Sequence, residues 1–116
     1  MEKLEIKLNG SRDEILKEIS EIKKFFSSFN IVDNEMSRIG KTWEKTGMVS
    51  HWKAFENYSL ADSKISACKT YLLTLEVVVR NNVAAKEIQE KSIDYFKKSY
   101  AEFVSRYEEA EKAEKE

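Results

Sequence analysis

The chain has 116 residues, no proline and only three glycines, at positions 10, 40 and 47. Globular proteins average roughly 5% proline and 7% glycine, and β-hairpins, tight turns and glycine-rich phosphate loops depend on these residues. The composition therefore argues against a β-sandwich, a Rossmann unit and a P-loop enzyme. Charged residues make up 35% and hydrophobic residues 41% of the chain, as expected of exposed helices with one apolar stripe. We predict an all-α protein.

The charge balance bears on the possible partners. Lys and Arg number 20 against 21 Asp and Glu, a formal net charge of −1. This balance provides no long-range attraction to nucleic acid or to an anionic membrane, and no apolar run approaches the ~20 residues of a membrane span. We therefore expect no nucleic-acid partner and no membrane insertion. The first residues also lack the continuous apolar segment of a Sec signal peptide.

The first part of the chain predicts an arm and a long helix. Residues 1–10 alternate apolar and polar side chains and end at an Asn-Gly turn signal, so we expect a short extended arm. Helix one, over 11–43, begins with a capping box formed by Ser11 and Glu14. Its apolar positions recur at threes and fours, close to the period of helical bundles. These positions are Ile15, Ile19, Ile22, Phe26, Phe29, Val32, Met36, Ile39 and Trp43.

The second part predicts a turn and a longer helix. Residues 44–50 form the turn, in which Gly47 suits the left-handed position after a helix. A loop this short makes consecutive helices antiparallel neighbours. Helix two is expected over 51–110, with a kink or a polar core layer near 80–83, and a frayed acidic tail follows over 111–116. The result is a helix-turn-helix hairpin with a long second helix.

The two predicted helices differ in length. Helix one can cover helix two only to about Val83, which leaves an aromatic stripe beyond it uncovered. Either the chain folds back after Asn82 as a third helix, or another chain covers the stripe. The lack of turn residues favours a second chain, and a dimer forming an antiparallel four-helix bundle would bury the surface that a lone hairpin exposes. The predicted partner interface consists of Trp52, Phe55, Phe96, Tyr100 and Phe103.

Candidate catalytic groups are few. His51 is the only histidine and has no obvious orienting carboxylate, and Cys68, the only cysteine, falls on the apolar stripe. Catalysis requires a positioned set of groups, and a metal site requires several ligands. We predict a non-enzymatic protein that uses no cofactor and no metal.

The remaining motifs carry a family resemblance. They are Trp43 and Gly47 at the turn, Trp52 and Phe55 after it, and the pattern Tyr-x-x-x-Glu formed by Tyr107 and Glu111. Together they resemble the Trp-Xaa-Gly family of small type VII secretion proteins, also called the early secreted antigenic target family. The resemblance spans nearly the whole chain. The turn is two residues longer than the family motif, which indicates a divergent branch such as the targeting partners of Leu-Xaa-Gly toxins.

The resemblance implies a function in protein export. It implies pairing as a homodimer, or as a heterodimer with a related helical protein or the N-terminal domain of a toxin. It also implies secretion from the cytoplasm without a Sec signal peptide, with Tyr107 and Glu111 as an export signal for the secretion ATPase. The expected function is that of a non-enzymatic type VII secretion substrate or effector-targeting partner acting by helix–helix recognition. The alternative is an intracellular helical adaptor or coiled-coil assembly module with no secretion role.

Overall fold

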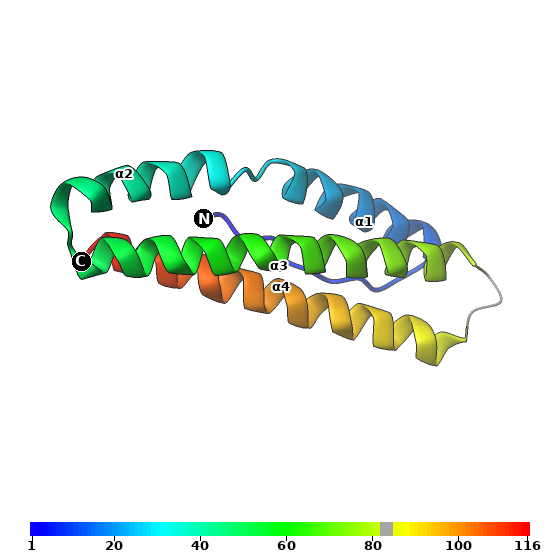
Figure 1. Ribbon diagram of the computed structural model, residues 1–116. Coiled ribbons are helices and arrows are strands. Elements are labelled where there is room, and N and C mark those ends of the chain that lie inside the picture. The colour runs from blue at the N-terminus through cyan, green and yellow to red at the C-terminus, as the bar shows by residue number, and fades with distance from the viewer. Residues whose placement is uncertain (82–84) are drawn as a thin grey trace.

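The computed structural model describes residues 1–81 and 85–116, and the regular elements in these ranges are all helical. They are α1 (Arg12–Ser27), the short π-helix η1 (Val32–Met36), α2 (Ser37–Thr46), α3 (Val49–Arg80) and α4 (Lys86–Glu114). The segment from α1 to α2 forms a bent first arm of the bundle, α3 runs back along it, and α4 reverses again beside α3 (Figure 1). The bundle is elongated, with extents of 56 × 20 × 19 Å. The predictions of an all-α fold and of a helical hairpin are confirmed.

Helix α1 begins at the capping box that the sequence indicates. The Ser11 hydroxyl accepts a hydrogen bond from the Glu14 amide, and the Glu14 carboxylate accepts one from the Ser11 amide, each at 3.2 Å. Two donors at the helix start that lack intrahelical partners are thereby satisfied. Hydrogen bonding of the Glu14 carboxylate to the backbone amide and to the side chain of Ser11 lowers the pKa of Glu14.

The first predicted helix is broken, which corrects the expectation of one continuous helix over 11–43. The hydroxyls of Ser27 and Ser28 donate to carbonyls three residues earlier, at 2.8 and 2.6 Å, and such bonds compete with the helical ladder. After the break, η1 shifts the inward-facing positions. Ile31 is 1% exposed whereas Val32, the predicted stripe residue, is 50% exposed. Helix α2 then continues to Thr46, past the predicted end at Trp43.

The expectation of one helix over 51–110 is also corrected. Helix α3 ends at Arg80, where Asn81 adopts an extended backbone, and α4 starts after Ala85, which is also extended. Ordinary extended residues flank the reversal on both sides, so a glycine or proline is not required at these positions. The predicted kink near 80–83 and the fold-back point at Asn82 fall partly or wholly outside the described residues. Of the two alternatives, the fold-back as a third helix is the one observed.

The C-terminal end differs from the frayed tail expected over 111–116. Helix α4 continues to Glu114. Ala110 and Ala113 are buried, and the Glu114 carboxylate is an ion-pair partner of Arg38 in α2. The buried alanines and the ion pair together hold the last turn of α4 against the bundle.

The core lies between the helices α1, α3 and α4. Phe26 of α1 is fully buried and meets Phe96 and Phe103 of α4 edge to face, with ring centroids 6.3 and 5.6 Å apart. Phe29 also meets Phe103 edge to face, at 5.3 Å. Edge-to-face pairs add to the stability that burial provides. The aromatic stripe of α4 is therefore covered by α1 of the same chain.

An N-terminal arm, residues 1–10, lies against α1 and α4. The Tyr100 hydroxyl accepts a hydrogen bond from the Leu4 amide at 2.8 Å and donates one to the Leu4 carbonyl at 3.2 Å. The Glu18 carboxylate accepts hydrogen bonds from the amides of Lys7 and Leu8, at 2.8 and 2.7 Å. The arm is neither helix nor strand, so side chains of α1 and α4 provide the hydrogen-bond partners that these backbone groups of the arm need.

Candidate functional site

The predicted turn residues Trp43 and Gly47 form the α2–α3 hairpin. Gly47 adopts a left-handed backbone, with φ of 62°, and its amide donates to the Trp43 carbonyl at 2.7 Å. The residue after it, Met48, is extended and leads directly into α3. Glycine enters this left-handed conformation without steric cost, so Gly47 permits the sharp change of direction.

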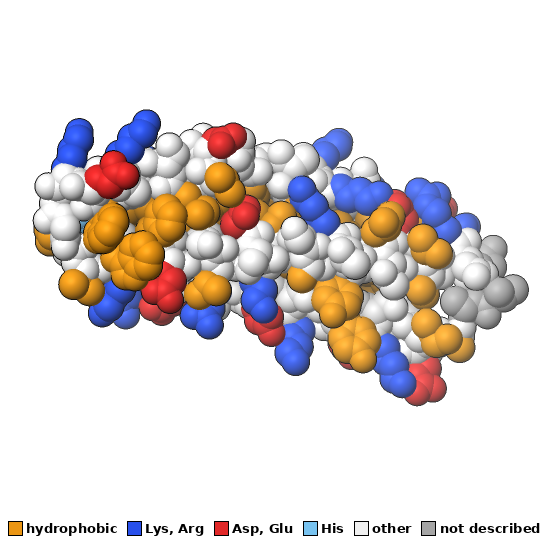
Figure 2. Space-filling view, viewed as in Figure 1, with side chains coloured by type: hydrophobic (Ala, Val, Ile, Leu, Met, Phe, Trp, Pro, Cys, Tyr) orange, Lys and Arg blue, Asp and Glu red, His pale blue; other side chains and the backbone are white. Residues whose placement is uncertain are grey.

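Aromatic side chains gather on the surface at this hairpin. The ring centroids of Trp43 and Trp52 are 5.3 Å apart, and those of Trp52 and Phe55 are 5.7 Å apart in a stacked pair. Trp43 is 38% and Trp52 45% exposed, with Met48 and Val49 exposed beside them. We call these five residues the hairpin patch. Hydrophobic side chains cluster at this end of the bundle in Figure 2, bordered by charged side chains.

Gly40 lies beneath the hairpin patch. A Cβ atom at this position would be 3.5 Å from the Phe55 ring, an ordinary van der Waals distance. The aromatic ring therefore rests close to the backbone of α2. This contact holds the Trp52–Phe55 stack against a rigid helix rather than a mobile loop.

The predicted export tyrosine is part of the interior. Tyr107 is 8% exposed, and its ring meets Tyr58 and Phe29 edge to face, at 5.3 and 5.9 Å. Its hydroxyl donates to Glu35 Oε1 at 3.1 Å. Burial and the neighbouring Glu35 carboxylate raise the pKa of Tyr107. The phenol ring is therefore largely buried in this fold.

The second residue of the predicted signal, Glu111, is also engaged. Its carboxylate accepts hydrogen bonds from the Met1 amino group, at 2.9 and 3.2 Å. The Glu111 side chain is 33% exposed. Tyr107 and Glu111 do lie one turn apart on α4, as predicted, but in this fold they contact the bundle and the arm.

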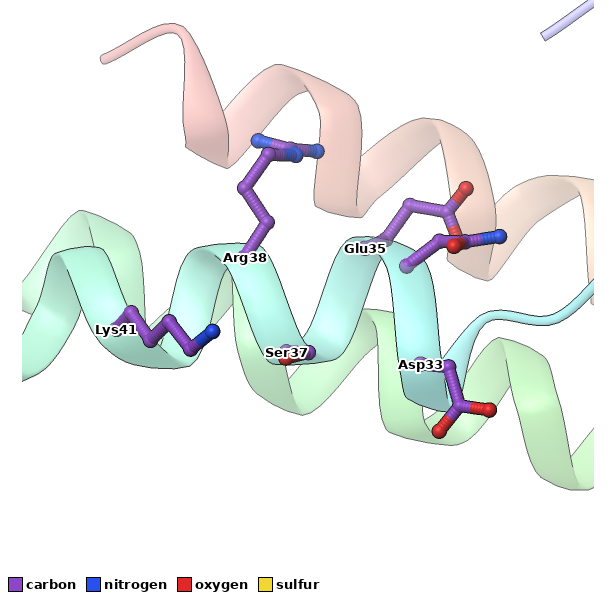
Figure 3. Close-up of a pocket in the computed structure, with 6 residues that line it drawn as sticks. Asp33, Glu35, Ser37, Arg38 and Lys41 are labelled. Atoms are coloured by element: carbon purple, nitrogen blue, oxygen red, sulfur yellow. The ribbon is translucent and has the colours of Figure 1, made fainter.

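A polar network that the sequence interpretation missed connects the helices near Tyr107. Glu35 and Arg38 project from η1 and α2 toward α4, from the rim of an open pocket (Figure 3). Arg38 forms an ion pair with Glu114, which also accepts a hydrogen bond from the Tyr58 hydroxyl at 2.6 Å. We call Glu35, Arg38, Tyr58, Tyr107 and Glu114 the inter-helix network. The sequence does contain a signal for this network. Tyr58 and Tyr107 both fall on apolar stripes, and a buried phenol hydroxyl requires a hydrogen-bond partner.

The predicted partner interface divides into two parts. Trp52 and Phe55 belong to the hairpin patch, in which Trp52 is exposed and Phe55 is half-buried. Phe96, Tyr100 and Phe103 are buried against α1 and the arm. The expectation that a second chain covers these three side chains is therefore corrected, because the fold-back of α4 covers them within one chain.

The remaining reactive residues have structural surroundings. His51 Nδ1 lies 2.6 Å from the Thr46 hydroxyl at the hairpin. Cys68 is fully buried, and burial raises the pKa of its thiol to about 12. Among the residues that the structure describes, no group of three or more His, Cys, Asp or Glu side chains is arranged to hold a metal ion.

Comparison with known protein families, with curated proteins and with solved structures finds no match to this chain. Over residues 1–81 and 85–116, no helix is both long and apolar enough to cross a membrane.

Proposed function

We propose that this protein is a non-enzymatic recognition module that binds a helix of a partner protein through the hairpin patch. We further propose, from the resemblance to the Trp-Xaa-Gly family, that it acts in type VII secretion as a substrate or as an effector-targeting partner. The observation that carries the proposal is the pair of exposed tryptophans, Trp43 and Trp52, clustered with the half-buried Phe55 at the hairpin.

The closed core gives the hairpin patch its significance. Phe26, Phe96 and Phe103 are fully buried within one chain, so folding does not require the two tryptophans to be covered. Isolated surface hydrophobic residues are common, but contiguous exposed apolar patches mark interaction sites. Tryptophan is also among the residues that contribute most to binding at interfaces. A patch of two tryptophans and a phenylalanine is therefore a favourable anchor.

The shape of the patch favours a helix as the binding element. Its rings come from the end of α2 and the start of α3, two helices that lie side by side (Figure 1). Amphipathic helices bind such surfaces through apolar residues spaced three and four apart. Charged side chains at the border supply the polar rim that such interfaces usually have. A related helical protein, or the N-terminal domain of a toxin, would offer this helix.

A second candidate function, the intracellular adaptor, is favoured by the position of the predicted export signal. The Tyr107 ring is buried and Glu111 accepts hydrogen bonds from the arm. A secretion ATPase could read this pair only after the arm and the last turns of α4 had moved. An adaptor would use the hairpin patch in the same way and would need no such movement.

The test compares two substitutions on the same helix. Trp52→Ala removes the centre of the hairpin patch, whereas Leu73→Ala alters an exposed leucine elsewhere on α3. Tagged variants of the full chain are purified from the native host, and the bound partner is identified and quantified. We expect Trp52→Ala to weaken partner binding by on the order of tenfold or more, Leu73→Ala to leave it unchanged, and both to unfold at similar temperatures. Equal partner recovery with the two variants would contradict the proposal.

A further inference from the structure

We propose that Asn9 is a modification site, at which spontaneous deamidation in water loosens the N-terminal arm from α1 and α4. The site is separate from the hairpin patch, and the inference does not rest on the proposed function. Three observations carry it. They are the Asn-Gly sequence, the unpaired groups where the arm joins α1, and the carboxylates that surround this junction.

The sequence at the base of the arm supplies the reacting groups. Asn9 precedes Gly10, and this is the only Asn-Gly pair in the sequence. The Gly10 amide nitrogen loses its proton and bonds to Asn9 Cγ, the Cγ–Nδ2 bond breaks, and ammonia leaves with that proton. Asparagine is a thermally labile residue, and a following glycine favours the attack because it has no side chain to obstruct the approach of its backbone.

Water then opens the cyclic imide at either of its carbonyl carbons. Hydrolysis at Cγ restores the original main chain and leaves an aspartate side chain at position 9. Hydrolysis at the backbone carbonyl instead carries the main chain through Cβ and Cγ, as isoaspartate, and lengthens it by a carbon atom. Both products have a carboxylate in place of a neutral amide, so each adds a negative charge.

The fold leaves the reacting groups available. Asn9 and Gly10 lie outside the helices and are exposed. Neither the Asn9 side chain nor the Gly10 amide has a hydrogen-bond partner within the part of the chain that the structure describes. Asn57 lies inside α3 instead, where its side-chain amide donates to the Lys53 carbonyl at 2.9 Å and the next backbone amide belongs to the helical ladder. Asn9 should therefore react in the folded protein, in which Asn57 is protected.

Carboxylates lie on both sides of Asn9. On one side the Glu18 carboxylate accepts hydrogen bonds from two consecutive amides of the arm, the second of them that of Leu8, at 2.7 Å. On the other side the Glu14 carboxylate lies against Gly10, where a Cβ atom would be 2.9 Å from Oε2. A new carboxylate at position 9 is therefore placed near two existing ones, and like charges repel.

The charges around this junction are mostly negative. The hollow that includes Glu14 and Glu18 is lined by more carboxylates than ammonium groups, namely by Glu5, Glu14, Glu18, Glu21, Lys7 and Lys17. An added negative charge is therefore unfavourable beside the docked arm. Because the Glu18 carboxylate holds the base of the arm, repulsion at this point weakens the docking.

The longer main chain of isoaspartate acts on the same junction. Leu8, on one side of Asn9, is 2% exposed. Ser11, on the other side, donates its amide to Glu14 Oε1 at 3.2 Å. An added carbon atom changes the length of the link between these two anchors, so we expect the arm to shift from its place. The Tyr100 hydroxyl of α4 would then lose its hydrogen bonds to the backbone of the arm.

Peptide mapping of the full chain over time tests the modification. The protein is incubated at mildly alkaline pH, either folded or in urea, and samples are digested under acidic conditions, which suppress further reaction. Mass spectrometry with electron-transfer fragmentation quantifies deamidation at each asparagine and distinguishes aspartate from isoaspartate. We expect position 9 to convert at comparable rates in the folded and the unfolded chain, and Asn57 to stay intact in the folded protein. An Asn9 that stays intact in the folded protein but converts in urea would overturn the proposal, and so would equal conversion of Asn9 and Asn57 in the folded protein.

Crosslinking of the same samples tests the effect on the arm. A zero-length carbodiimide joins adjacent amines and carboxylates. Lys3 Nζ lies 3.3 Å from Glu108 Oε1 and reports the docked arm, whereas Lys64 Nζ lies 2.8 Å from Glu102 Oε2 and reports the α3–α4 pairing as an internal control. We expect the Lys3–Glu108 product to decrease in proportion to the conversion at position 9, and the Lys64–Glu102 product to stay constant.

The variant Asn9→Gln separates conversion from other effects of the incubation. Its side chain keeps the amide, but attack by the Gly10 nitrogen would close a larger and less favourable ring. We therefore expect neither deamidation at position 9 nor loss of the Lys3–Glu108 product in this variant. Undiminished Lys3–Glu108 crosslinking in the converted wild type would contradict the effect on the arm. Equal loss of this product in Asn9→Gln would also contradict it, because the arm would then loosen without conversion.

Discussion

The Tyr107 hydroxyl of α4 donates a hydrogen bond to Glu35 Oε1 of η1, at 3.1 Å and across 72 positions of the sequence. The second oxygen of Glu35 is buried and has no hydrogen-bond partner among residues 1–81 and 85–116, so the Tyr107 hydroxyl is an important partner of this carboxylate. The bond joins the bend of the first helix to the last turns of α4. Tyr107 therefore has a structural role, in addition to any role in an export signal.

Removal of the Tyr107 hydroxyl should destabilise the fold. Tyr107→Phe keeps the ring packing but leaves the partly buried Glu35 carboxylate without this donor, at a cost of about 1–3 kcal/mol in the free energy of unfolding. Urea denaturation measures the change. Tyr95→Phe, at an exposed tyrosine, is the control and should stay within about 0.5 kcal/mol of wild type. Equal stability of the two variants would show that the Tyr107–Glu35 bond contributes nothing.

The same reasoning decides which variant suits an export assay. Tyr107→Ala would remove a buried ring and leave a cavity, which typically costs about 3–5 kcal/mol for a buried aromatic side chain. Failure of this variant to appear outside the cell would then reflect unfolding. Tyr107→Phe separates the hydroxyl from the packing and is the informative substitution.

The buried tyrosines predict a loss of stability at alkaline pH. Burial raises the pKa of Tyr58, Tyr100 and Tyr107 above that of a free phenol. Because the folded pKa is the higher one, the unfolded chain releases protons first, so stability is fully present below about pH 10 and falls as the pH rises above it. Thermal unfolding between pH 8 and pH 11 should show a decrease above about pH 10, coupled to phenolate absorbance. Ionisation of all five tyrosines without unfolding would contradict this prediction.

Cys68 should react only when the protein opens. Its thiol is fully buried, with the pKa raised to about 12, and the reactive species is the thiolate. At pH 8 we expect the aromatic disulfide reagent DTNB to label the folded protein more slowly than the urea-unfolded protein, by on the order of 10³-fold or more. Rapid labelling of the folded protein would place Cys68 at an accessible surface.

The two glycines of the hairpin region should respond oppositely to alanine. At Gly40 a new Cβ meets Phe55 at an ordinary contact distance within α2, so Gly40→Ala should stabilise by about 0.5–1 kcal/mol. At Gly47 the space is open but φ is 62°, so Gly47→Ala should destabilise by about 1–2 kcal/mol. Differential scanning calorimetry of both variants measures the two signs. Destabilisation by Gly40→Ala would mean that Phe55 cannot adjust to the added methyl group.

The helical class and the start of α1 could be predicted because their causes are local. The Ser11–Glu14 capping box depends on a spacing of three residues, and the left-handed Gly47 depends on a property of one residue. The break after Ser27 was not predictable from the apolar pattern, which continues through it at threes and fours. The π-helix η1 follows the break, and Ile31 is buried in place of Val32.

The fold-back of α4 shows why the candidate site could be predicted only in part. The lack of glycine and proline suggested one continuous helix, yet Asn81 and Ala85 flank the reversal in ordinary extended conformations. Whether Phe96 and Phe103 meet Phe26 or a second chain is decided by tertiary packing, which periodicity does not encode. The exposed Trp43 and Trp52 follow from the same packing, because the core closes beside them and leaves the hairpin patch uncovered.

The most direct test of the proposed function measures where the protein accumulates and whether the hairpin patch controls this. Wild type, Trp52→Ala and Leu73→Ala are expressed in the native host, and each is quantified in the cells and in the culture supernatant, with a cytoplasmic marker to detect lysis. The proposal predicts that wild type and Leu73→Ala appear in the supernatant and that folded Trp52→Ala remains in the cells. Retention of the wild type and both variants in the cells would contradict the secretion role and favour the adaptor, and equal export of all three proteins would contradict recognition through the patch.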